Sequence, residues 1–348
     1  MRVALLADAA SVHSQRWAVA LTAQGVEVAI WSEREWPNAP STLPVHRLRP
    51  AGRNLLSAGR QLRRELDRFQ PDVVHAHYVS RYGLYGALAN RHPLVMSVWG
   101  ADVEVFPYEH RGLNRTVLRW ILRYADAITA SSQYLQRVTS RDARQPVAVI
   151  PFGIDLAHFR PHPPNPGGPL RWIINKALEP VYGIDILLPV MKDLMGEGPW
   201  EGRILGDGSA RQAISEQIAA LGLSDRVSLV GRVTPEDLPE ALAWADVGLY
   251  PSRRESFGVA PLEMQALGRA VMAHRLGGLP EVVKERETGY LVTPDSFSAW
   301  HALLADAVRN PDAIRSMGQQ GPAFVKEHYD FHGNVEAMMA LYDKAIGR

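Results

Sequence analysis

The chain has 348 residues, of which 46% are hydrophobic and 22% are charged, and its formal net charge at pH 7 is +1. This length is too great for one comfortable core, so we expect two domains of ordinary globular composition. The absence of cysteine excludes disulfides and thiolate metal sites and permits a reducing compartment.

The first half alternates short β-rich runs with helical runs. Strands are expected at Arg2–Ala7, Val26–Trp31, Val73–Ala76, 94–98, 126–130 and 147–150. Helices are expected at 13–24, 55–69, 80–91, 112–125 and 132–140. This alternation predicts βαβ units and a parallel sheet.

The beginning of the chain lacks the pattern of a signal peptide, because Met1–Ala10 is only mildly apolar and contains Asp8. No apolar stretch approaches the ~20 residues that span a bilayer. We therefore expect a cytoplasmic protein.

A proline-rich stretch, Arg160–Pro169, follows these elements. It contains five prolines and two glycines, which excludes a helix or a central strand. We interpret it as the linker between two domains.

The second half repeats the alternation without any internal sequence repeat. Strands are expected at Leu170–Ile174, Arg203–Leu205, Val227–Val230, Asp246–Tyr250 and Val271–Ala273. Helices are expected at 184–195, 209–222, 259–268 and from 296 to the end. Ser209 and Thr234 are expected to be helix N-caps, the latter with Pro235 at the first helical position.

Two loops of the second half suit phosphate groups, since ligands of doubly wound sheets bind at the carboxyl ends of strands. The glycines of Gly206-Asp-Gly-Ser209 let a ligand approach the backbone at a helix N-terminus, although plain turns often look the same. Lys176 follows the first strand of this half and can neutralise a leaving diphosphate, although such a lysine is more often simply solvated.

A third loop carries two glutamates around the start of the helix near Gly258. The backbone amides of Ser256, Phe257 and Gly258 are expected to point at a diphosphate. Glu255 lies just before the helix and Glu263 lies within it. Carboxylates accept hydrogen bonds from sugar hydroxyls, so we expect one of the two to hold the transferred sugar and the other the ribose. Surface charge is the alternative for a lone glutamate pair.

A longer pattern joins these loops. It runs Tyr250-Pro-Ser-(x2)-Glu-Ser-Phe-Gly-(x4)-Glu-Met-Gln-Ala-Leu-Gly, then Gly277-Gly-Leu-Pro-Glu281 and Thr288-Gly-Tyr-Leu-Val292, preceded by Gly206-Asp-Gly-(x2)-Arg211 and Val230-Gly-Arg232. This pattern resembles the donor domain of glycosyltransferase family 4. The resemblance is specific over about residues 170–295 and looser at Pro71–His77 and Trp99–Asp102.

The resemblance implies an α/β protein of GT-B fold, in which two Rossmann-like doubly wound domains face each other across a cleft. Residues 1–160 plus 329–348 would form the acceptor-side domain, and residues 161–328 the donor domain. The implied reaction transfers a hexose-type sugar, with retention of configuration, from a nucleotide diphosphate sugar to a glycan, lipid-linked or small-molecule hydroxyl acceptor. No metal or other cofactor is implied, and the sequence has no Asp-x-Asp or HExxH motif.

The expected donor site has Glu255 and Lys176 as its catalytic residues. Its other expected members bind the donor: Gly206, Arg211, Val230, Arg232, Ser256, Phe257, Gly258 and Glu263. Charge on the leaving diphosphate would be met by Lys176, Arg211 and the helix N-terminus after Glu255.

The chain departs from the family pattern in two regions, the loop after the first strand of the second half and Trp99. Lys176 stands where many members carry an arginine, and Tyr182 stands where they carry a lysine, so one fixed positive charge is missing. A subset of the family writes Leu-Glu-Pro-x-Tyr here, as this chain does. Trp99 replaces a histidine that many members place before glycine. His75 or His77 is the expected substitute for that contact, and a structural histidine is the alternative for each.

The acceptor is poorly specified by the sequence. Its expected contacts in the first half are His13, Arg16, His77, Trp99 and Asp102.

The first half is also strongly basic. Residues 1–160 carry 20 arginines, no lysine and 13 acidic side chains, a net charge of +7 against −6 for the rest. Four arginines fall every four residues on one expected helix near Trp120, at 111, 115, 119 and 123, and others lie at 53, 60, 63, 64 and 68. This basic surface is expected to meet anionic lipid on the inner membrane face or a phosphorylated acceptor, with a solvated helix face as the alternative. Nucleic acid is not expected, because no recognisable module accompanies the arginines.

Three other functions stay open for a chain of this pattern: a sugar phosphorylase, a nucleotide-sugar epimerase and a non-catalytic sugar-binding protein. A phosphorylase would need a site for free phosphate. A non-catalytic protein is disfavoured because Glu255, Gly258 and Glu263 are all present.

Overall fold

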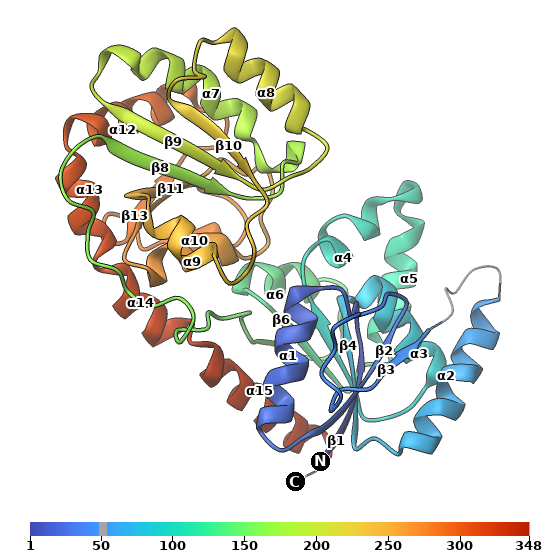
Figure 1. Cartoon of the computed structure of the whole chain (residues 1–348). Helices are drawn as coiled ribbons and strands as arrows, with labels where there is room; N and C mark the ends of the chain where they lie inside the picture. Colours follow the sequence, from blue (N-terminus) through green and yellow to red (C-terminus); the bar gives the residue numbers. More distant parts are fainter. Residues whose placement is uncertain (49–53, 348) are drawn as a thin grey trace. The chain divides into compact units, whose positions relative to one another are not determined.

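The computed structural model describes residues 1–48 and 54–347, and these residues form two compact units (Figure 1). The first unit comprises Met1–Phe152 and the segment from His332 onward, and the second comprises Gly153–Phe331. The chain therefore changes unit at Gly153, ahead of the boundary expected after residue 160, and changes back at His332 rather than at residue 329.

A parallel sheet organises the first unit, and seven of its strands lie in the described residues. Their order is β3-β2-β1-β4-β5-β6-β7. Their bounds are β1 Arg2–Leu6, β2 Glu27–Ser32, β3 Val45–Arg47, β4 Val73–His77, β5 Leu94–Val98, β6 Ala127–Ala130 and β7 Val147–Val149. Strands β4 and β5 are buried along their whole length. Helices cover both faces of a parallel sheet, which buries even the polar residues of these strands: His75 and His77 on β4 and Ser97 on β5.

The helices of the first unit connect these strands in sequence. They are α1 Val12–Ala23, α2 Leu55–Phe69, the π-helix η1 Tyr78–Gly83, α3 Leu84–Ala89, α4 Ala101–Glu104, α5 Leu113–Leu122 and α6 Gln133–Thr139. The last helix, α15 Phe331–Ala345, returns to this unit and packs Tyr342 into its core.

A second parallel sheet, with six strands in the described residues, organises the second unit in the order β10-β9-β8-β11-β12-β13. Its strands are β8 Leu170–Asn175, β9 Trp200–Leu205, β10 Val227–Gly231, β11 Val247–Tyr250, β12 Ala270–His274 and β13 Gly289–Val292. Its helices are α7 Ile184–Asp193, α8 Arg211–Ala220, α9 Leu238–Ala243, α10 Val259–Ala266, α11 Leu279–Val282, α12 Phe297–Arg309, α13 Pro311–Gly318 and α14 Gly321–His328.

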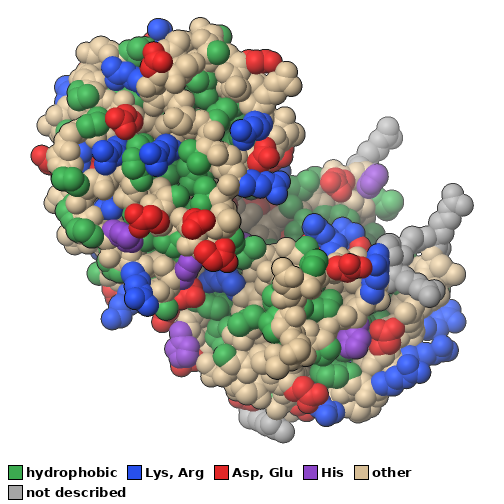
Figure 2. All heavy atoms as spheres, in the orientation of Figure 1, with side chains coloured by type: hydrophobic (Ala, Val, Ile, Leu, Met, Phe, Trp, Pro, Cys, Tyr) green, Lys and Arg blue, Asp and Glu red, His purple; other side chains and the backbone are tan. Residues whose placement is uncertain are grey.

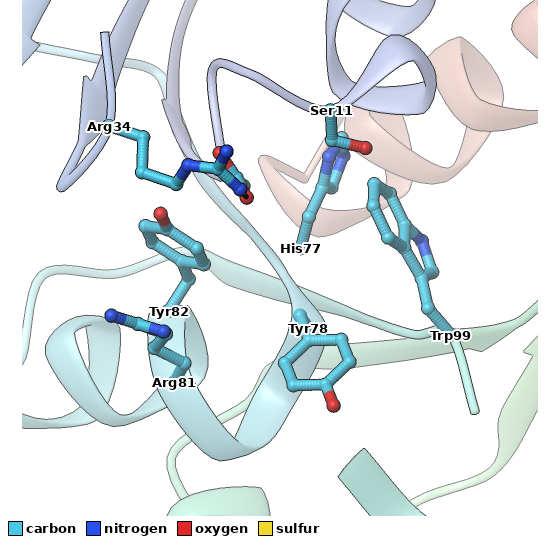
Figure 3. Close-up of a pocket in the computed structure, with 8 residues that line it drawn as sticks. Ser11, Arg34, His77, Tyr78, Arg81, Tyr82 and Trp99 are labelled. Carbon is cyan, nitrogen blue, oxygen red and sulfur yellow. Dashed lines mark hydrogen bonds and ion pairs between the residues drawn. The ribbon is translucent and has the colours of Figure 1, made fainter. Parts of the chain in front are cut away.

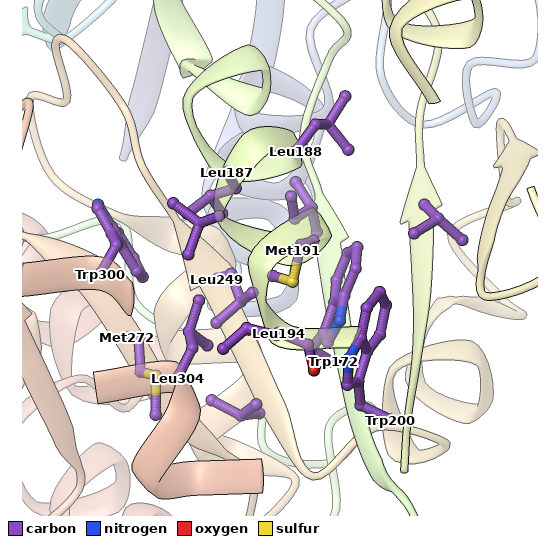
Figure 4. Close-up of a cluster of buried hydrophobic side chains, with 14 of the residues drawn as sticks. Trp172, Leu187, Leu188, Met191, Leu194, Trp200, Leu249, Met272, Trp300 and Leu304 are labelled. Carbon is purple, nitrogen blue, oxygen red and sulfur yellow. Dashed lines mark hydrogen bonds between the residues drawn. The ribbon is translucent and has the colours of Figure 1, made fainter. Parts of the chain in front are cut away.

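The core of the second unit is built around tryptophans (Figure 4). The indoles of Trp172 and Trp200 lie 6.1 Å apart at an interplanar angle of 34°. Gly202 makes room for them, because a Cβ there would lie 2.1 Å from a ring atom of Trp172. Each large apolar side chain buried in this way contributes about 1.5–3 kcal/mol.

Most expected elements are present within a few residues of their expected bounds, but both proposed helix caps are wrong. The side chain of Ser209 hydrogen-bonds to Glu179, and α8 begins only at Arg211 without a side-chain cap. Thr234 closes a turn, in which its hydroxyl accepts the Asp237 amide at 3.3 Å, and α9 begins at Leu238. In both places a turn precedes the helix, so the polar residue satisfies the turn.

The proline-rich stretch is not a linker between the units but a strap fastened along the second unit. Asn165 donates to the backbone carbonyls of Trp244 and Ala245 at 3.0 and 3.1 Å and to the Asp246 carboxylate at 3.0 Å. Arg315 contacts the carbonyl oxygens of Gly168 and Pro169, both at 3.2 Å. Residues 160–169 therefore belong to the second unit, and the chain passes from the first unit to the second before them.

Candidate active site

Three loops of the second unit meet at the carboxyl ends of its central strands. Lys176 follows β8, Gly206 follows β9, and Glu255 lies between β11 and α10. The strand order reverses between β8 and β11, which is where doubly wound sheets bind ligands. Gly206 has a φ of +124°, and a Cβ on it would lie 2.0 Å from the carbonyl oxygen of Lys176. The close approach of the first two loops therefore requires glycine.

Lys176 and Glu255 form a nearly buried ion pair. Nζ of Lys176 lies 2.5 Å from Oε2 of Glu255, and only 12% and 14% of the two side chains are exposed. Burial by itself lowers the pKa of Lys176, but Glu255, with Tyr182 and Glu263, outweighs burial and raises it above its usual value. Lys176 is therefore a fixed positive charge at neutral pH.

Glu263, on α10, is oriented by two residues at strand ends. The side-chain amide of Asn175 donates to its Oε2 at 3.2 Å, and the Tyr250 hydroxyl donates to Oδ1 of Asn175 at 2.6 Å. Burial, together with Glu263 and Glu255, raises the pKa of Tyr250 well above its usual value, so its phenol stays protonated. This network fixes the Glu263 carboxylate beside the Lys176–Glu255 pair.

Helix α10 begins at Val259, and its N-cap residue, Gly258, has a φ of +118° and provides no side-chain cap. The preceding loop is held by a glycine pair: the Gly278 amide donates to the Glu255 carbonyl at 3.0 Å, and a Cβ on Gly277 would lie 1.9 Å from that oxygen. The positive end of the helix dipole therefore faces the loop of Glu255. Phe257 buries its ring, which leaves only its backbone to meet a ligand.

A pocket of about 270 Å³ opens at this switch point. Its lining residues are Asn175, Lys176, Ala177, Leu205, Gly206, Arg232, Val233, Leu238 and Glu263. The expected donor-binding or catalytic residues among them are Lys176, Gly206, Arg232 and Glu263. Glu255 is not in the lining, but it forms an ion pair with Lys176.

The other expected donor residues are not among those that line the pocket. Arg211, like Arg232 of the lining, lies 3.9 Å from a carboxylate oxygen of Asp207, which partly offsets the positive charge of both. Val230, on β10, is 48% exposed. Ser256 is half-buried in the loop before α10. Among the described residues, no three His, Asp or Glu side chains gather as metal ligands would.

A second pocket, of about 290 Å³, lies in the first unit, where the strand order reverses between β1 and β4 (Figure 3). Its lining residues are Asp8, Ser11, Arg34, His77, Tyr78, Arg81, Tyr82 and Trp99.

Three expected acceptor-side residues form one aromatic cluster at this pocket. The rings of His77 and Trp99 lie 4.6 Å apart, and His13 stands edge-on to Trp99 at 6.1 Å while stacking on Phe152 at 4.5 Å. Burial, with smaller effects of His75 and His13, lowers the pKa of His77 well below its usual value. His77 is therefore neutral.

Of the five expected acceptor-side residues, only His77 and Trp99 line this pocket; the other three, His13, Arg16 and Asp102, do not. Asp102 is completely buried, and its carboxylate accepts the amides of Val79 at 2.9 Å and Gly100 at 2.8 Å. Burial raises its pKa to about 6. Asp102 thus shapes the pocket wall. Arg16 is half-buried on α1.

His75 has a structural environment. It is completely buried, with Nδ1 2.6 Å from the Tyr342 hydroxyl and Nε2 2.7 Å from the Ser97 hydroxyl. It ties α15 to the sheet, and of the two histidines on β4 only His77 lines the pocket.

The basic stripe expected at residues 111–123 is partly neutralised, because Arg115 and Arg119 share the Asp142 carboxylate, at 2.9 and 2.6 Å. Arg123 is exposed. The side chain of Arg111 and all of Arg53 lie outside the described residues.

Sequence reasoning missed several residues of both pockets and of the network around Glu263. Asn175, which lines the donor pocket, and Tyr250, which orients Asn175, could have been found, because each is the last residue of a central strand. Nothing in the sequence pattern pointed to Arg34, Arg81 and Tyr82 as pocket residues, because only the fold brings the end of β2 next to η1.

Comparisons with known proteins place both halves of the chain. The family described as glycosyl transferase 4-like matches residues 2–132, and the family described as glycosyl transferases group 1 matches residues 158–324. A D-inositol 3-phosphate glycosyltransferase of Segniliparus rotundus is 29% identical over 58% of this chain and 48% of its own length. An uncharacterized glycosyltransferase of Methanocaldococcus jannaschii is 24% identical over 78% of this chain and 75% of its own. The chain spans about half the length of several curated relatives that it matches.

Solved structures share the fold over nearly the whole chain. Sucrose-phosphate synthase of Thermosynechococcus elongatus superposes with a TM-score of 0.85 at 20% identity, covering 99% of this chain and 98% of that one. HepE of Anabaena, solved with UDP, gives a TM-score of 0.82 at 18% identity over 99% and 100% of the two chains. The fold is therefore GT-B, and the chain belongs to the group 1, family 4 type of glycosyltransferases.

Proposed function

We propose that this glycosyltransferase moves a hexose-type sugar from a nucleoside diphosphate sugar, bound by the second unit, to a hydroxyl group of an acceptor bound by the first unit. Transfer retains the anomeric configuration and uses no metal. The observation that carries the proposal is the fixed charge of Lys176 beside two carboxylates in the switch-point pocket.

Each part of the donor has a complementary group. Lys176 and the N-terminus of α10 carry opposite charge to the diphosphate. Glu255 accepts hydrogen bonds from hydroxyls of the transferred sugar once the phosphate has drawn Lys176 toward itself. Glu263, oriented by Asn175, accepts those of the ribose. The solved HepE complexes with UDP and with UDP-glucose support a donor of this class.

The reaction step needs no protein nucleophile. The acceptor oxygen forms a bond to the anomeric carbon on the face from which the diphosphate leaves, while the bond from that carbon to the phosphate oxygen breaks. The departing phosphate oxygen takes the proton of the acceptor hydroxyl. The protein contributes positioning and stabilisation of the developing negative charge. Because protein groups supply that positive charge, we include metal independence in the proposal.

The basic surface on α2 supports a cytoplasmic enzyme in peripheral contact with anionic lipid. Arg60, Arg64 and Arg68 repeat every four residues, are exposed, and have no carboxylate within 4.0 Å among the described residues. Figure 2 shows blue side chains gathered over this helix at the lower right. Leu55 and Leu56, 40% and 65% exposed, begin the same helix. No helix in the described parts of the chain is long and apolar enough to cross a membrane.

The test is a nucleotide-binding screen followed by turnover. UDP, GDP and ADP are titrated in EDTA by calorimetry, and the matching nucleotide sugars are then incubated with acceptors. We expect one nucleotide to bind and its sugar to be transferred without metal, with the product's anomeric configuration unchanged by NMR. Binding without transfer, but with release of sugar 1-phosphate from glycosides in phosphate buffer, would favour a phosphorylase. Conversion of the nucleotide sugar to its epimer would favour an epimerase. Sugar binding without any reaction would favour a non-catalytic protein.

A further inference from the structure

We infer that the pocket of the first unit binds an uncharged carbohydrate ring, so that the acceptor hydroxyl belongs to a sugar residue that carries no phosphate at this site. The inference rests on the proposed transferase function and names the class of its acceptor. Four features of the pocket carry it.

The first feature is charge balance. Arg34 lies 3.1 Å from the Asp8 carboxylate, and Arg81 binds the Glu33 carboxylate. Glu33 also accepts the Tyr85 hydroxyl at 2.7 Å. Both arginines that line the pocket are therefore matched by carboxylates, and the surplus positive charge that a phosphate favours is missing. The lining side chains include both hydrogen-bond donors, such as Arg34 and Arg81, and an acceptor carboxylate, Asp8. This mixture suits hydroxyl groups, because each hydroxyl both donates and accepts.

The second feature is the aromatic content of the walls. Tyr78, Tyr82 and Trp99 line the pocket beside the paired arginines (Figure 3). A sugar ring has apolar C–H faces and a polar rim, so it matches flat aromatic surfaces combined with a few charged hydrogen-bonding groups.

The third feature is a costly backbone conformation that serves this pocket. Tyr78 has a φ of +68°, which a bulky side chain rarely adopts, and it opens the π-helix η1. That single element supplies Tyr78, Arg81 and Tyr82 to the pocket. The buried carboxylate of Asp102 holds it by accepting the Val79 amide. Strained segments and π-helices of this kind concentrate at ligand sites.

The fourth feature is a buried side-chain nitrogen without a hydrogen-bond partner among the described residues. His77 is 1% exposed, lines the pocket, and its Nδ1 has no hydrogen-bond partner among the described residues. Buried side-chain nitrogens are usually paired. A neutral imidazole nitrogen can donate to or accept from a hydroxyl, so a bound sugar would satisfy it.

The experiment is saturation-transfer difference NMR on the full chain with the methyl α-glycosides of glucose, mannose and galactose, and thermal shift with inorganic phosphate. We expect at least one glycoside to bind. The Arg34→Gln variant should weaken it about tenfold, the effect of losing one charge-assisted hydrogen bond. Arg47→Gln is the matched control: Arg47 pairs with Glu35 at 2.6 Å, is similarly exposed and does not line the pocket. Trp99→Leu should also weaken binding.

The inference is overturned if no glycoside binds, or if glycoside binding is the same in Arg34→Gln, Trp99→Leu and the wild type. Stabilisation by phosphate that Arg34→Gln abolishes would also overturn it, in favour of an anionic acceptor. The proposed transferase function fails separately, through the absence of nucleotide binding to the second unit. Lys176→Ala should remove nucleotide binding and leave the glycoside signal intact, so the two failures are distinguishable.

Discussion

The ring of Tyr182 faces the ammonium group of Lys176, with 5.0 Å between the ring centroid and Nζ. The segment that carries Tyr182 is pinned to the loop after β11. The Arg253 amide donates to the Val181 carbonyl at 2.8 Å, and the Arg253 guanidinium binds Asp185. Tyr182 therefore does not supply the positive charge that the family pattern places at this position. It places an aromatic face against Lys176.

Replacing Tyr182 should separate the contribution of its ring from that of its hydroxyl. A cation–π contact is worth about 0.5–2 kcal/mol, so Tyr182→Leu should lower kcat/KM for the donor about 2- to 30-fold. Tyr182→Phe keeps the ring and should stay within about twofold of the wild type. Steady-state kinetics with varied donor measure both. If Tyr182→Phe loses as much as Tyr182→Leu, the hydroxyl is the active group and the ring is not.

Lys176 and Glu255 should be indispensable to transfer. Removing a group that stabilises the developing charge costs about 100- to 1,000-fold in rate, so Lys176→Met and Glu255→Gln should each lower kcat at least 100-fold. Lys192→Met is the matched control, because Lys192 is exposed on α7 outside the pocket. Single-turnover measurements with saturating donor isolate the chemical step. Near-normal kcat in either variant would contradict the roles assigned to the pair.

The same pair makes a prediction about folding. Each single variant leaves a nearly buried charge without its partner, so Glu255→Gln should lower the free energy of unfolding by about 3 kcal/mol. The double variant Lys176→Met/Glu255→Gln buries no uncompensated charge and should recover much of that loss. Urea unfolding of the wild type, the two single variants and the double variant measures the four free energies of unfolding that the comparison needs. Strictly additive losses would show that the two side chains do not interact.

The sequence predicted the strand–helix alternation well, because near-continuous apolar strands and amphipathic helices are local signals. It predicted much less where a segment is ordered by distant partners. The proline-rich strap depends on Asn165 and on Arg315, which binds the buried Asp246 at 3.0 Å, and no local pattern reveals contacts across the second unit. The short strands β3 and β13 were missed for the same reason, since pairing along a sheet edge defines them.

The candidate site was predictable on the donor side and not on the acceptor side. Glu255, Glu263 and Lys176 lie in loops whose glycines and spacing form a recognisable pattern, and the fold brings them together as expected. The pairing of Lys176 with Glu255 was not visible in the sequence, because the two residues lie on different loops. In the first unit the pocket depends on a π-helix and on two ion pairs between separate elements, which no spacing rule indicates.

Acid should lower the free energy of unfolding, because His75 is buried in its neutral form. Burial lowers its pKa to about 3, against about 6.5 in the unfolded chain. Below pH 6.5 the unfolded chain binds a proton at this histidine that the folded protein does not. The free energy of unfolding should therefore fall by up to ~1.4 kcal/mol per pH unit as the pH drops from 6.5 toward 3. His77 acts in the same direction.

The variant His75→Gln tests this dependence, because glutamine can hydrogen-bond to Tyr342 and Ser97 but does not titrate. Urea unfolding at pH 7 and pH 5 should show a smaller difference between the two pH values in His75→Gln than in the wild type. His328→Gln is the control, since His328 is about half exposed. An unchanged difference in His75→Gln would show that other groups cause the acid sensitivity.

Anionic vesicles should bind the chain through α2 rather than α5. On α2, Arg60, Arg64 and Arg68 are exposed without carboxylate partners in the described parts of the chain, whereas Arg115 and Arg119 on α5 share Asp142. Each unmatched arginine near an anionic surface adds to the attraction, and salt screens it.

Sedimentation with phosphatidylglycerol vesicles measures this binding. The triple variant Arg60→Gln/Arg64→Gln/Arg68→Gln should lose at least about tenfold in apparent affinity at low salt, and the wild type should lose binding as salt rises. The double variant Arg115→Gln/Arg119→Gln should bind like the wild type. The reverse result, with binding lost only in the α5 variant, would move the lipid contact to α5. Equal binding of all three proteins would mean that neither set of arginines meets the membrane.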